Sequence, residues 1–272
     1  PILKRKEIVV ECERLLNDFK PELIWLDYLF IGQYIAVFKK KGIPVIYGTH
    51  NAQSKLTQQE AQSRGSLLQR MKYRSMAKLH VMHERAFFKK ADYLVCVSEQ
   101  DRAFYCRFLQ EERLLIIPNF IYIQDYSKIP QYESKKPFIC FVGSIDNFQN
   151  AQGILFFLRE IWQELKDRAG QLPLFVVGRG SKSNAEILTF SKNMRDVFLF
   201  DDVESVVPFI KGSVASIVPL LHGSGTRLKI IESMACRTPV VSTSLGAEGI
   251  TVSDGKEILI ADTPDQFVTQ IL

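Results

Sequence analysis

The stretch that decides the fold runs from residue 217 to residue 250 and reads IVPLLHGSGTRLKIIESMACRTPVVSTSLGAEGI. Its hydrophobic pattern predicts a buried strand, a turn of small residues, a helix, a second buried strand and a second turn. In the first turn, Gly223 and Gly225 let the backbone approach a ligand closely, and Ser224 and Thr226 supply hydroxyls. The turn leads directly into a helix N-terminus, where unpaired amides and the helix dipole favour an anion.

Charged side chains follow this turn. Arg227 and Lys229 add positive charge at the start of the helix, and Glu232 follows further along it. A site with these parts suits a nucleotide sugar, with the diphosphate at the helix start and the ribose hydroxyls on the carboxylate. Phosphate binding is therefore the first functional hypothesis.

The size and composition of the chain are those of a globular protein with two domains. Its 272 residues exceed the usual size of one domain, and 46% of them are hydrophobic and 24% charged. No stretch is long and apolar enough to predict a membrane span. The five cysteines are widely spaced and form no C-x-x-C motif. This spacing is typical of reduced cytosolic thiols rather than of a disulfide framework or a zinc site.

Positive charge is concentrated in the first half of the chain. Residues 1–137 carry a net charge of +8, whereas residues 138–272 carry −3. Much of the excess lies on one predicted helix, as Arg70, Lys72, Arg74, Lys78, Arg85, Lys89 and Lys90. A solvated helix face explains this charge, and contact with anionic lipid headgroups or a phosphorylated acceptor is the alternative. No motif for RNA or DNA accompanies it, so nucleic acid is not an expected partner.

Helical and strand patterns alternate through the first half. Strands are expected over residues 22–26, 45–47, 93–97 and 114–117, and helices over 5–19, 29–40, 67–90 and 98–109. The polar segment over residues 52–65 is expected to be mobile or loosely helical. The pattern lapses over residues 118–137, which we interpret as a linker between a domain over residues 1–130 and a domain over residues 131–272.

The alternation resumes after the linker. Strands are expected over residues 138–142, 174–177, 197–200 and 215–219, and helices over 151–166, 182–191 and 203–210. Alternation with buried apolar strands predicts two parallel-sheet α/β domains, in which ligands bind at the carboxyl ends of the strands. Four turns of the second domain occupy that position: Gly143-Ser144, Gly178-Arg179-Gly180, Asp201-Asp202 and Gly223–Thr226.

With these elements placed, the chain resembles the retaining glycosyltransferases of the GT-B fold, in the family called glycosyl transferases group 1 or family 4. The motifs that carry the resemblance are FVGS at 141–144, VGRG at 177–180, GSGTRLKIIESMA at 223–235, PVVST at 239–243 and GAEG at 246–249. In the first half, ADYLVCVSE at 91–99, IPN at 117–119 and THN at 49–51 fit the same family. The resemblance implies two Rossmann-like domains that face a cleft.

The resemblance also implies roles for residues at matching positions. It places Gly143 and Ser144 at the turn that faces the reaction centre, and Arg179 near the donor diphosphate or the base. It pairs the backbone of Val203 with the nucleobase. His50 matches the position near the anomeric carbon that orients the transferred sugar or the acceptor.

The longest motif supplies the rest of the implied donor site. Ser224, Gly225 and Thr226 would hold the diphosphate, and Glu232 would bind the ribose. We infer from their position alone that Arg227 and Lys229 take over the diphosphate charge, because the family's usual Arg and Lys pair is absent after the first strand of this domain.

The chain departs from the family pattern at its sugar-binding position and at its ends. Ser224 stands where the family's motif has its first glutamate, so recognition of the sugar is expected to differ. The initial strand and glycine-rich loop of the first domain and the closing helix of the second have no counterpart, so the chain is expected to be truncated at both ends.

The resulting functional expectation is a retaining glycosyltransferase, of the hexosyl- or a related class. It would move a sugar from a nucleotide-sugar donor to a glycan or lipid-linked acceptor in cell-surface polysaccharide or glycolipid biosynthesis. No metal or other cofactor is expected, because there is no Asp-x-Asp motif and the cations would stabilise the leaving diphosphate. The expected location is the cytoplasm, with peripheral contact at the inner face of the membrane through the basic first domain.

Two alternatives stay open at this point. A nucleotide-sugar epimerase of the same fold would need acid and base carboxylates and histidines that the sequence does not offer. A non-catalytic protein that binds a nucleotide sugar as a partner or regulatory subunit fits the change at Ser224.

His80, His83 and Glu84 lack the spacing of a metalloprotease and are expected on a helix surface.

Overall fold

The computed structural model describes residues 5–63, 65–223 and 226–272. The chain forms two compact units, which are described separately below. The first extends to Asn119 and also includes Thr226, and the second comprises residues 120–223 and 227–272. The predicted linker over residues 118–137 includes the point of division.

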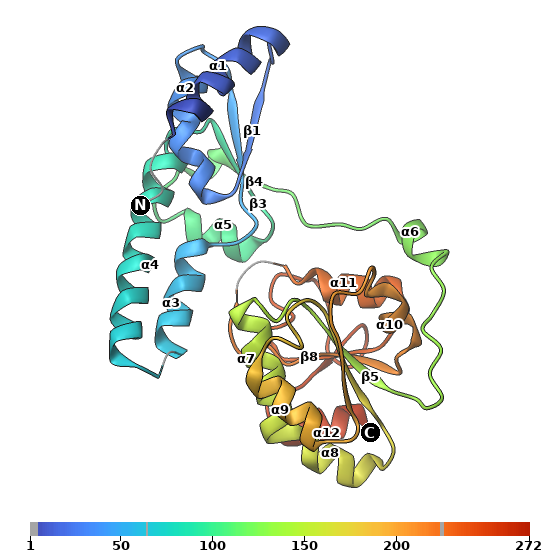
Figure 1. The fold of residues 1–272 in the computed structure, drawn as a ribbon. Helices are drawn as coiled ribbons and strands as arrows, with labels where there is room; N and C mark the ends of the chain where they lie inside the picture. Colours follow the sequence, from blue (N-terminus) through green and yellow to red (C-terminus); the bar gives the residue numbers. More distant parts are fainter. Residues whose placement is uncertain (1–4, 64, 224–225) are drawn as a thin grey trace. The chain divides into compact units, whose positions relative to one another are not determined.

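The first unit is built on a four-stranded parallel sheet in the order β1-β2-β3-β4 (Figure 1). Its strands are β1 (Ile24–Asp27), β2 (Val45–Gly48), β3 (Tyr93–Cys96) and β4 (Leu114–Ile116). Its helices are α1 (Lys6–Phe19), η1 (Leu29–Tyr34), α2 (Ile35–Lys39), α3 (Gln53–Ser63), α4 (Leu67–Phe88), α5 (Glu99–Tyr105) and η2 (Glu111–Arg113). All four predicted strands are present, and the Ser98 hydroxyl caps α5 by accepting from the amide of Asp101.

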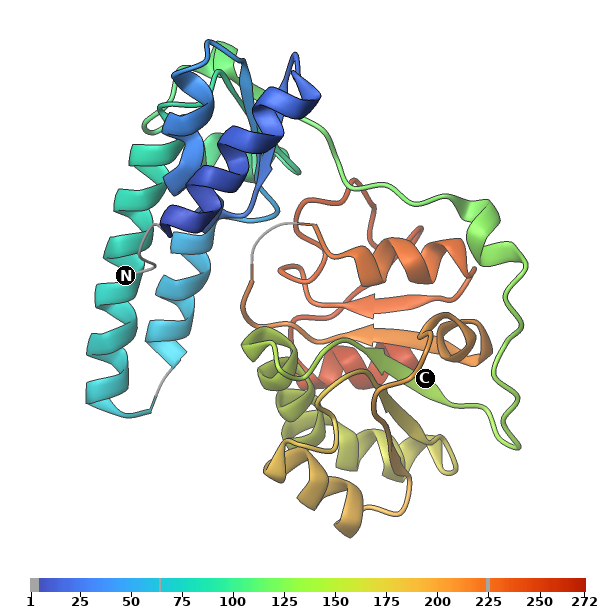
Figure 2. The same cartoon turned by 45° about the horizontal axis from the view of Figure 1, so that its top comes forward.

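Of the two expectations for the polar segment after β2, mobile or loosely helical, the structure shows a helix, α3. Helices α3 and α4 run side by side as a hairpin (Figure 2). Ser54, Thr57 and Ala61 are buried on the inner side of α3. The sequence left a mobile and a loosely helical segment open, because the buried face of this helix is made mostly of small polar residues, which give no hydrophobic period.

The expectation that His80 and Glu84 lie on a helix surface was wrong. His80 is 6% exposed and Glu84 1% exposed, on the same face of α4 as Ala77 and Phe88. Their neighbours explain the burial: His80 Nδ1 is 2.9 Å from the Thr57 hydroxyl, and the Glu84 carboxylate accepts hydrogen bonds from Ser54. A polar partner on α3 replaces the apolar contact that a hydrophobic pattern would have indicated.

The second unit contains a six-stranded parallel sheet in the order β10-β9-β8-β5-β6-β7. Its strands are β5 (Ile139–Val142), β6 (Leu174–Val177), β7 (Val197–Phe200), β8 (Ala215–Val218), β9 (Val240–Ser242) and β10 (Leu259–Ile260). The chain adds β6 and β7 on one side of β5 and then returns to add β8, β9 and β10 on the other. This reversal makes a topological switch point between β5 and β8, where α/β sheets bind their ligands.

Helices cover both faces of this sheet (Figure 1). The helices of this unit are α6 (Ile123–Ser127), which packs against α11, and then α7 (Phe148–Phe156), the π-helical turn η3 (Phe157–Ile161), α8 (Trp162–Ala169), α9 (Ala185–Asn193), α10 (Val207–Gly212), α11 (Leu228–Ala235) and α12 (Pro264–Ile271). Alternate residues of β5 belong to different cores: Ile139 and Phe141 pack with α7–α8, and Cys140 and Val142 pack with α10. The prediction of two parallel-sheet α/β domains is confirmed.

The last part of the predicted linker packs against the second unit. Lys211 Nζ donates to the backbone oxygens of Tyr126 and Ser127 at the end of α6. The Tyr132 ring stacks on Phe209, with centroids 4.6 Å apart, and its amide donates to Pro208. Residues 123–132 are therefore part of the second unit rather than a free connection.

Candidate functional site

The turn after β5 lies at the switch point of the second sheet and leaves no room for a side chain at Gly143. Gly143 has a φ of +153°, and a Cβ there would lie 2.7 Å from both Lys229 Nζ and Asn150 Nδ2. A side chain at Gly178, in the turn after β6, would collide with the Gly143 carbonyl. These glycines bring the two turns and the Lys229 ammonium together.

Lys229 reaches this turn from the first turn of α11. Its Nζ donates to Asn150 Oδ1 at 2.8 Å and lies 4.6 Å from the centroid of the Phe141 ring. Part of the side chain is exposed, but the ammonium itself is enclosed among these groups. Burial, followed by repulsion from Arg227, lowers the pKa of Lys229 to about 7. The site therefore holds a poorly solvated cation, which an incoming anion would stabilise.

Asn150 is a member of the site that sequence reasoning missed. It lies on α7 with 8% of its surface exposed, and its Nδ2 donates to the backbone oxygen of Ser144 at 2.8 Å. The available signal was an asparagine at the start of the mostly apolar run NAQGILFF at 150–157, because a buried amide needs polar partners.

Arg227 precedes α11 as its N-cap residue and is 7% exposed. A side chain at Gly223 would collide with its guanidinium, so the glycine is what lets the arginine lie across the turn. Thr226 is half-buried next to it. Ser224 and Gly225, the other two expected diphosphate ligands, lie outside the described residues.

Glu232 lies on α11, close enough to Lys229 to favour its charged form. Its Oε1 accepts a hydrogen bond of 3.2 Å from the hydroxyl of Tyr126 on α6. Burial and the nearby Glu232 carboxylate raise the pKa of Tyr126 to about 12, so the phenol stays protonated and acts as a donor. Tyr126 was missed because the sequence around it was interpreted as linker.

Arg179 and Val203 lie on the β6 and β7 side of the site. The Arg179 side chain is 72% exposed, and its Nε donates to Asp146 at 2.8 Å. The Asp201 carboxylate holds the same loop by accepting from the amides of Gly180 and Lys182, at 2.8 and 3.2 Å. Val203 is half-buried against the aromatic and aliphatic core under β5 and β6.

One buried hydroxyl at the switch point has no hydrogen-bond partner among the described residues. The Oγ of Ser144 is inaccessible to solvent and unpaired. Such groups are rare in folded proteins because they lose hydration without compensation. The turn is therefore incompletely satisfied in the protein alone.

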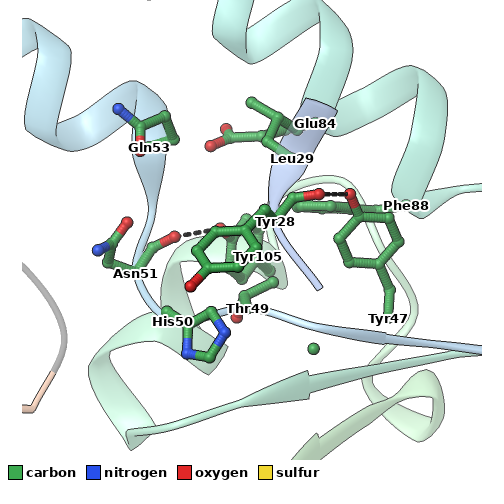
Figure 3. Close-up of a pocket in the computed structure, with 11 residues that line it drawn as sticks. Tyr28, Leu29, Tyr47, Thr49, His50, Asn51, Gln53, Glu84, Phe88 and Tyr105 are labelled. Carbon is green, nitrogen blue, oxygen red and sulfur yellow. Dashed lines mark hydrogen bonds between the residues drawn. The ribbon is translucent and has the colours of Figure 1, made fainter. Parts of the chain in front are cut away.

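His50 lies in the first unit, at the loop that follows β2. Its side chain is 51% exposed, with Nε2 3.5 Å from Asp27 Oδ1 and its ring 5.0 Å from that of Tyr28. The loop borders a pocket of about 120 Å³ (Figure 3). Since the units are described separately, His50 is not placed relative to the residues of the second unit.

The pocket beside His50 is lined by aromatic rings and by polar groups of the α3–α4 hairpin. In Figure 3 the Glu84 carboxylate points toward Gln53, at the start of α3. Its oxygens accept from the amide of Ser54 at 3.0 Å and from the Ser54 hydroxyl at 2.6 Å. Burial raises the pKa of Glu84, and these hydrogen bonds act in the opposite direction. Glu84 thus caps α3 from a neighbouring helix.

Three further observations concern cofactors and membranes. Among the described residues, no group of three or more His, Cys, Asp or Glu side chains is placed to hold a metal ion. The expectation of metal-independent chemistry stays a prediction. None of the five cysteines, all of which lie in the described ranges, forms a disulfide. In the described part of the chain, no helix combines the length and the apolar character that crossing a membrane requires.

Family models match almost the whole chain. The model for glycosyl transferases group 1 matches residues 136–272, and the model for glycosyltransferase family 4 matches residues 4–125. A curated relative is an uncharacterized 44.6 kDa protein in the cps region of Klebsiella pneumoniae, 23% identical over 168 residues. This match covers 60% of the chain and 43% of the relative, so the chain spans less than half of that protein.

Solved structures share the fold of the whole chain. Sucrose-phosphate synthase from Thermosynechococcus elongatus superposes with a TM-score of 0.75 at 17% identity, covering 97% of this chain and 67% of that one. Anabaena HepE in complex with UDP and glucose superposes with a TM-score of 0.71 at 12% identity, covering 97% and 71%. Both comparisons support the two-domain fold expected from the sequence.

Proposed function

Because the chain belongs to the glycosyl transferases group 1 family, we propose that it transfers a sugar from a nucleotide-sugar donor to a glycan or lipid-linked acceptor, with retention of configuration. The acceptor would belong to cell-surface polysaccharide or glycolipid biosynthesis. The cps region named for the Klebsiella pneumoniae relative supports polysaccharide synthesis. The UDP and glucose bound to the Anabaena protein support a nucleotide-sugar donor.

The observation that carries this proposal is the enclosed Lys229 ammonium at the switch point, next to Arg227 and the start of α11. A cation with little solvation gains most when a dianionic diphosphate arrives. Transfer of the sugar leaves negative charge on that diphosphate, and fixed cations that face it lower the barrier. Lys229 and Arg227 would supply this charge, and one oxygen of the departing phosphate would accept the proton of the acceptor hydroxyl.

The other residues would bind the rest of the donor. The Glu232 carboxylate would accept hydrogen bonds from the ribose hydroxyls, while Tyr126 donates to one of its oxygens. Arg179 would contact the diphosphate or the base, and the Val203 backbone would pair with the base. His50 would orient the transferred sugar or the acceptor.

We also propose that the first unit contacts the anionic inner face of the membrane through α4. Besides its basic residues, this helix exposes large apolar side chains, with Leu68 79%, Met71 58% and Met82 65% exposed. Apolar side chains that insert and cations that bind headgroups are the two parts of an interfacial helix. Sedimentation with vesicles containing anionic lipid, compared with neutral vesicles, tests this contact.

Incubation of the full-length protein with UDP-, GDP- and dTDP-sugars and an acceptor panel tests the function. We expect one donor to release its nucleoside diphosphate with formation of a product glycan. Epimerised free nucleotide sugar, or stabilisation by a nucleotide without turnover on any acceptor, would instead favour an epimerase or a non-catalytic binding protein.

Metal removal gives a separate prediction. Since the protein's own cations would stabilise the leaving diphosphate, transfer should persist after dialysis against EDTA, with a rate within about twofold of the untreated enzyme. Loss of turnover that Mg²⁺ or Mn²⁺ restores would show that a metal does this work.

A further inference from the structure

Asn150 joins two parts of the switch point that come from different segments of the chain. Its Oδ1 accepts from Lys229 Nζ at 2.8 Å, and its Nδ2 donates to the backbone oxygen of Ser144 at 2.8 Å. Lys229 is carried by α11, Ser144 by the turn after β5, and Asn150 by α7. One amide therefore fixes a cation from one element and a backbone turn from another.

The chemistry of the amide sets its orientation. A rotated amide would place its NH₂ group against an ammonium and its oxygen against a carbonyl, so both contacts would become repulsive. Asn150 is 8% exposed, so water cannot replace these partners easily. The side chains closest in size to Asn150 cannot make both contacts: an ionised Asp has no donor, and Leu has neither a donor nor an acceptor.

We propose that Asn150 is a positioning residue for the donor diphosphate. It would aim the Lys229 ammonium and the Gly143-Ser144 turn at the same phosphate oxygens. The inference rests on the donor site proposed above and adds a residue to it. The unpaired Ser144 hydroxyl in the same turn supports the role, because the turn that Asn150 holds still has one hydrogen-bonding group without a partner.

The charged groups around Lys229 define what a change at Asn150 can do. Arg227 at the start of α11 favours the neutral amine, whereas Glu232 on α11 favours the ammonium. Burial raises the pKa of the Cys140 thiol on β5 to about 11, so this neighbour is uncharged where Lys229 titrates. Asn150 faces the ammonium from α7 with its carbonyl oxygen, which favours the charged form as well. A carboxylate in place of this neutral acceptor should therefore raise the pH at which Lys229 titrates, and the hydrocarbon side chain of leucine should lower it.

The first experiment reads Lys229 in the free protein, without any nucleotide. Acetylation of Lys229 by acetic anhydride is followed by mass spectrometry as a function of pH, for the wild type, Asn150→Asp and Asn150→Leu. The pH at which labelling is half-maximal should rise by about one pH unit in Asn150→Asp and fall in Asn150→Leu. Gln163→Glu, an amide-to-acid change at an exposed position of α8, is the control and should not move it.

The second experiment measures the affinity for UDP, GDP and dTDP with the same variants. We expect about tenfold weaker binding in Asn150→Leu, and also weaker binding in Asn150→Asp, because its second oxygen faces the Ser144 carbonyl and adds negative charge near the diphosphate. Thermal unfolding identifies any variant that fails to fold. If either Asn150→Asp or Asn150→Leu fails to fold, the other variant still supplies the comparison with the wild type.

The outcomes separate this inference from the proposed function. If Lys229 labelling shifts as expected but no nucleoside diphosphate binds the wild type, the contact is present and the donor site is wrong. If nucleotides bind the wild type and both variants with the same affinity, or if neither variant shifts the labelling, Asn150 is not a positioning residue.

Discussion

The buried charge of Lys229 is proposed to bind the donor diphosphate, but it destabilises the folded protein in the absence of that ligand. Its ammonium is enclosed by Asn150, the Phe141 ring and the turn at Gly143, and its pKa is lowered from 10.5 to about 7. The unfolded chain therefore binds this proton more tightly than the folded protein between these two pH values. The folded state is penalised fully below pH 7, and the penalty disappears as the pH rises toward 10.5.

Replacing this residue should consequently stabilise the free protein. Lys229→Met keeps the length of the side chain and removes the charge, so its free energy of unfolding should exceed that of the wild type by about 1–3 kcal/mol at pH 7. The difference should shrink toward pH 10. Urea denaturation at several pH values measures it, and a variant less stable than the wild type at pH 7 would contradict the burial of the charge.

Glu232 carries the ribose assignment. Glu232→Ala should weaken the affinity for the donor nucleotide by about 10- to 100-fold, because hydrogen bonds from the ribose hydroxyls to a charged acceptor are lost. Calorimetric titration measures the change. The matched control is Glu257→Ala, an exposed carboxylate elsewhere in the second unit. Unchanged affinity in Glu232→Ala would refute the assignment.

At the scale of elements, the helical hairpin depends on a buried carboxylate. Glu84 of α4 accepts from the amide and the hydroxyl of Ser54 in the first turn of α3, where backbone amides have no partner within the helix. The loop from His50 to Gln53, which borders the pocket of the first unit, leads directly into α3 of this hairpin.

Removing this cap should loosen α3. Glu84→Ala should lower the free energy of unfolding by about 2–3 kcal/mol, and Ser54→Ala by about 1 kcal/mol, since the second variant keeps the bond from the backbone amide. In the Glu84→Ala variant, the backbone amides of α3 should exchange their hydrogens faster than in the wild type, whereas exchange in α1 should change less. Glu13→Ala, an exposed residue of α1, is the control, and equal effects of Glu13→Ala and Glu84→Ala would contradict the capping role.

The elements show what sequence patterns predict and what they miss. Strands β6 and β7 were predicted at their observed bounds because buried parallel strands are continuous apolar runs. Helix α4 was predicted, but its buried face was not, because His80 and Glu84 are buried through polar partners on α3. The turns at Gly143 and Gly178 could be located from their glycines, whereas the contacts of Asn150 and Tyr126 depend on packing between distant segments.

At the scale of the whole molecule, the two units carry different parts of the proposed chemistry. Lys229, Arg227 and Glu232, the proposed ligands of the diphosphate and the ribose, lie in the second unit, whereas His50 and the excess positive charge lie in the first. A change at His50 should therefore affect the reaction without affecting the affinity for the nucleotide.

The variant His50→Ala tests this division. It should lower kcat by about 100-fold or more, because an orienting group near the reacting atoms is lost, while the dissociation constant of the nucleoside diphosphate stays within about twofold of the wild type. Steady-state kinetics and calorimetry supply the two numbers. Parallel losses in kcat and nucleotide affinity would show that His50 does not act separately from the donor site.

The most direct test of the donor site is a crystal structure of the full-length protein with the nucleoside diphosphate that binds it. We predict that its phosphate oxygens lie within hydrogen-bond distance of Lys229 Nζ and of the turn at Gly143 and Ser144, with the ribose hydroxyls on the Glu232 carboxylate. A nucleotide bound away from the ends of β5 and β8, or a ribose without contact to Glu232, would contradict this account.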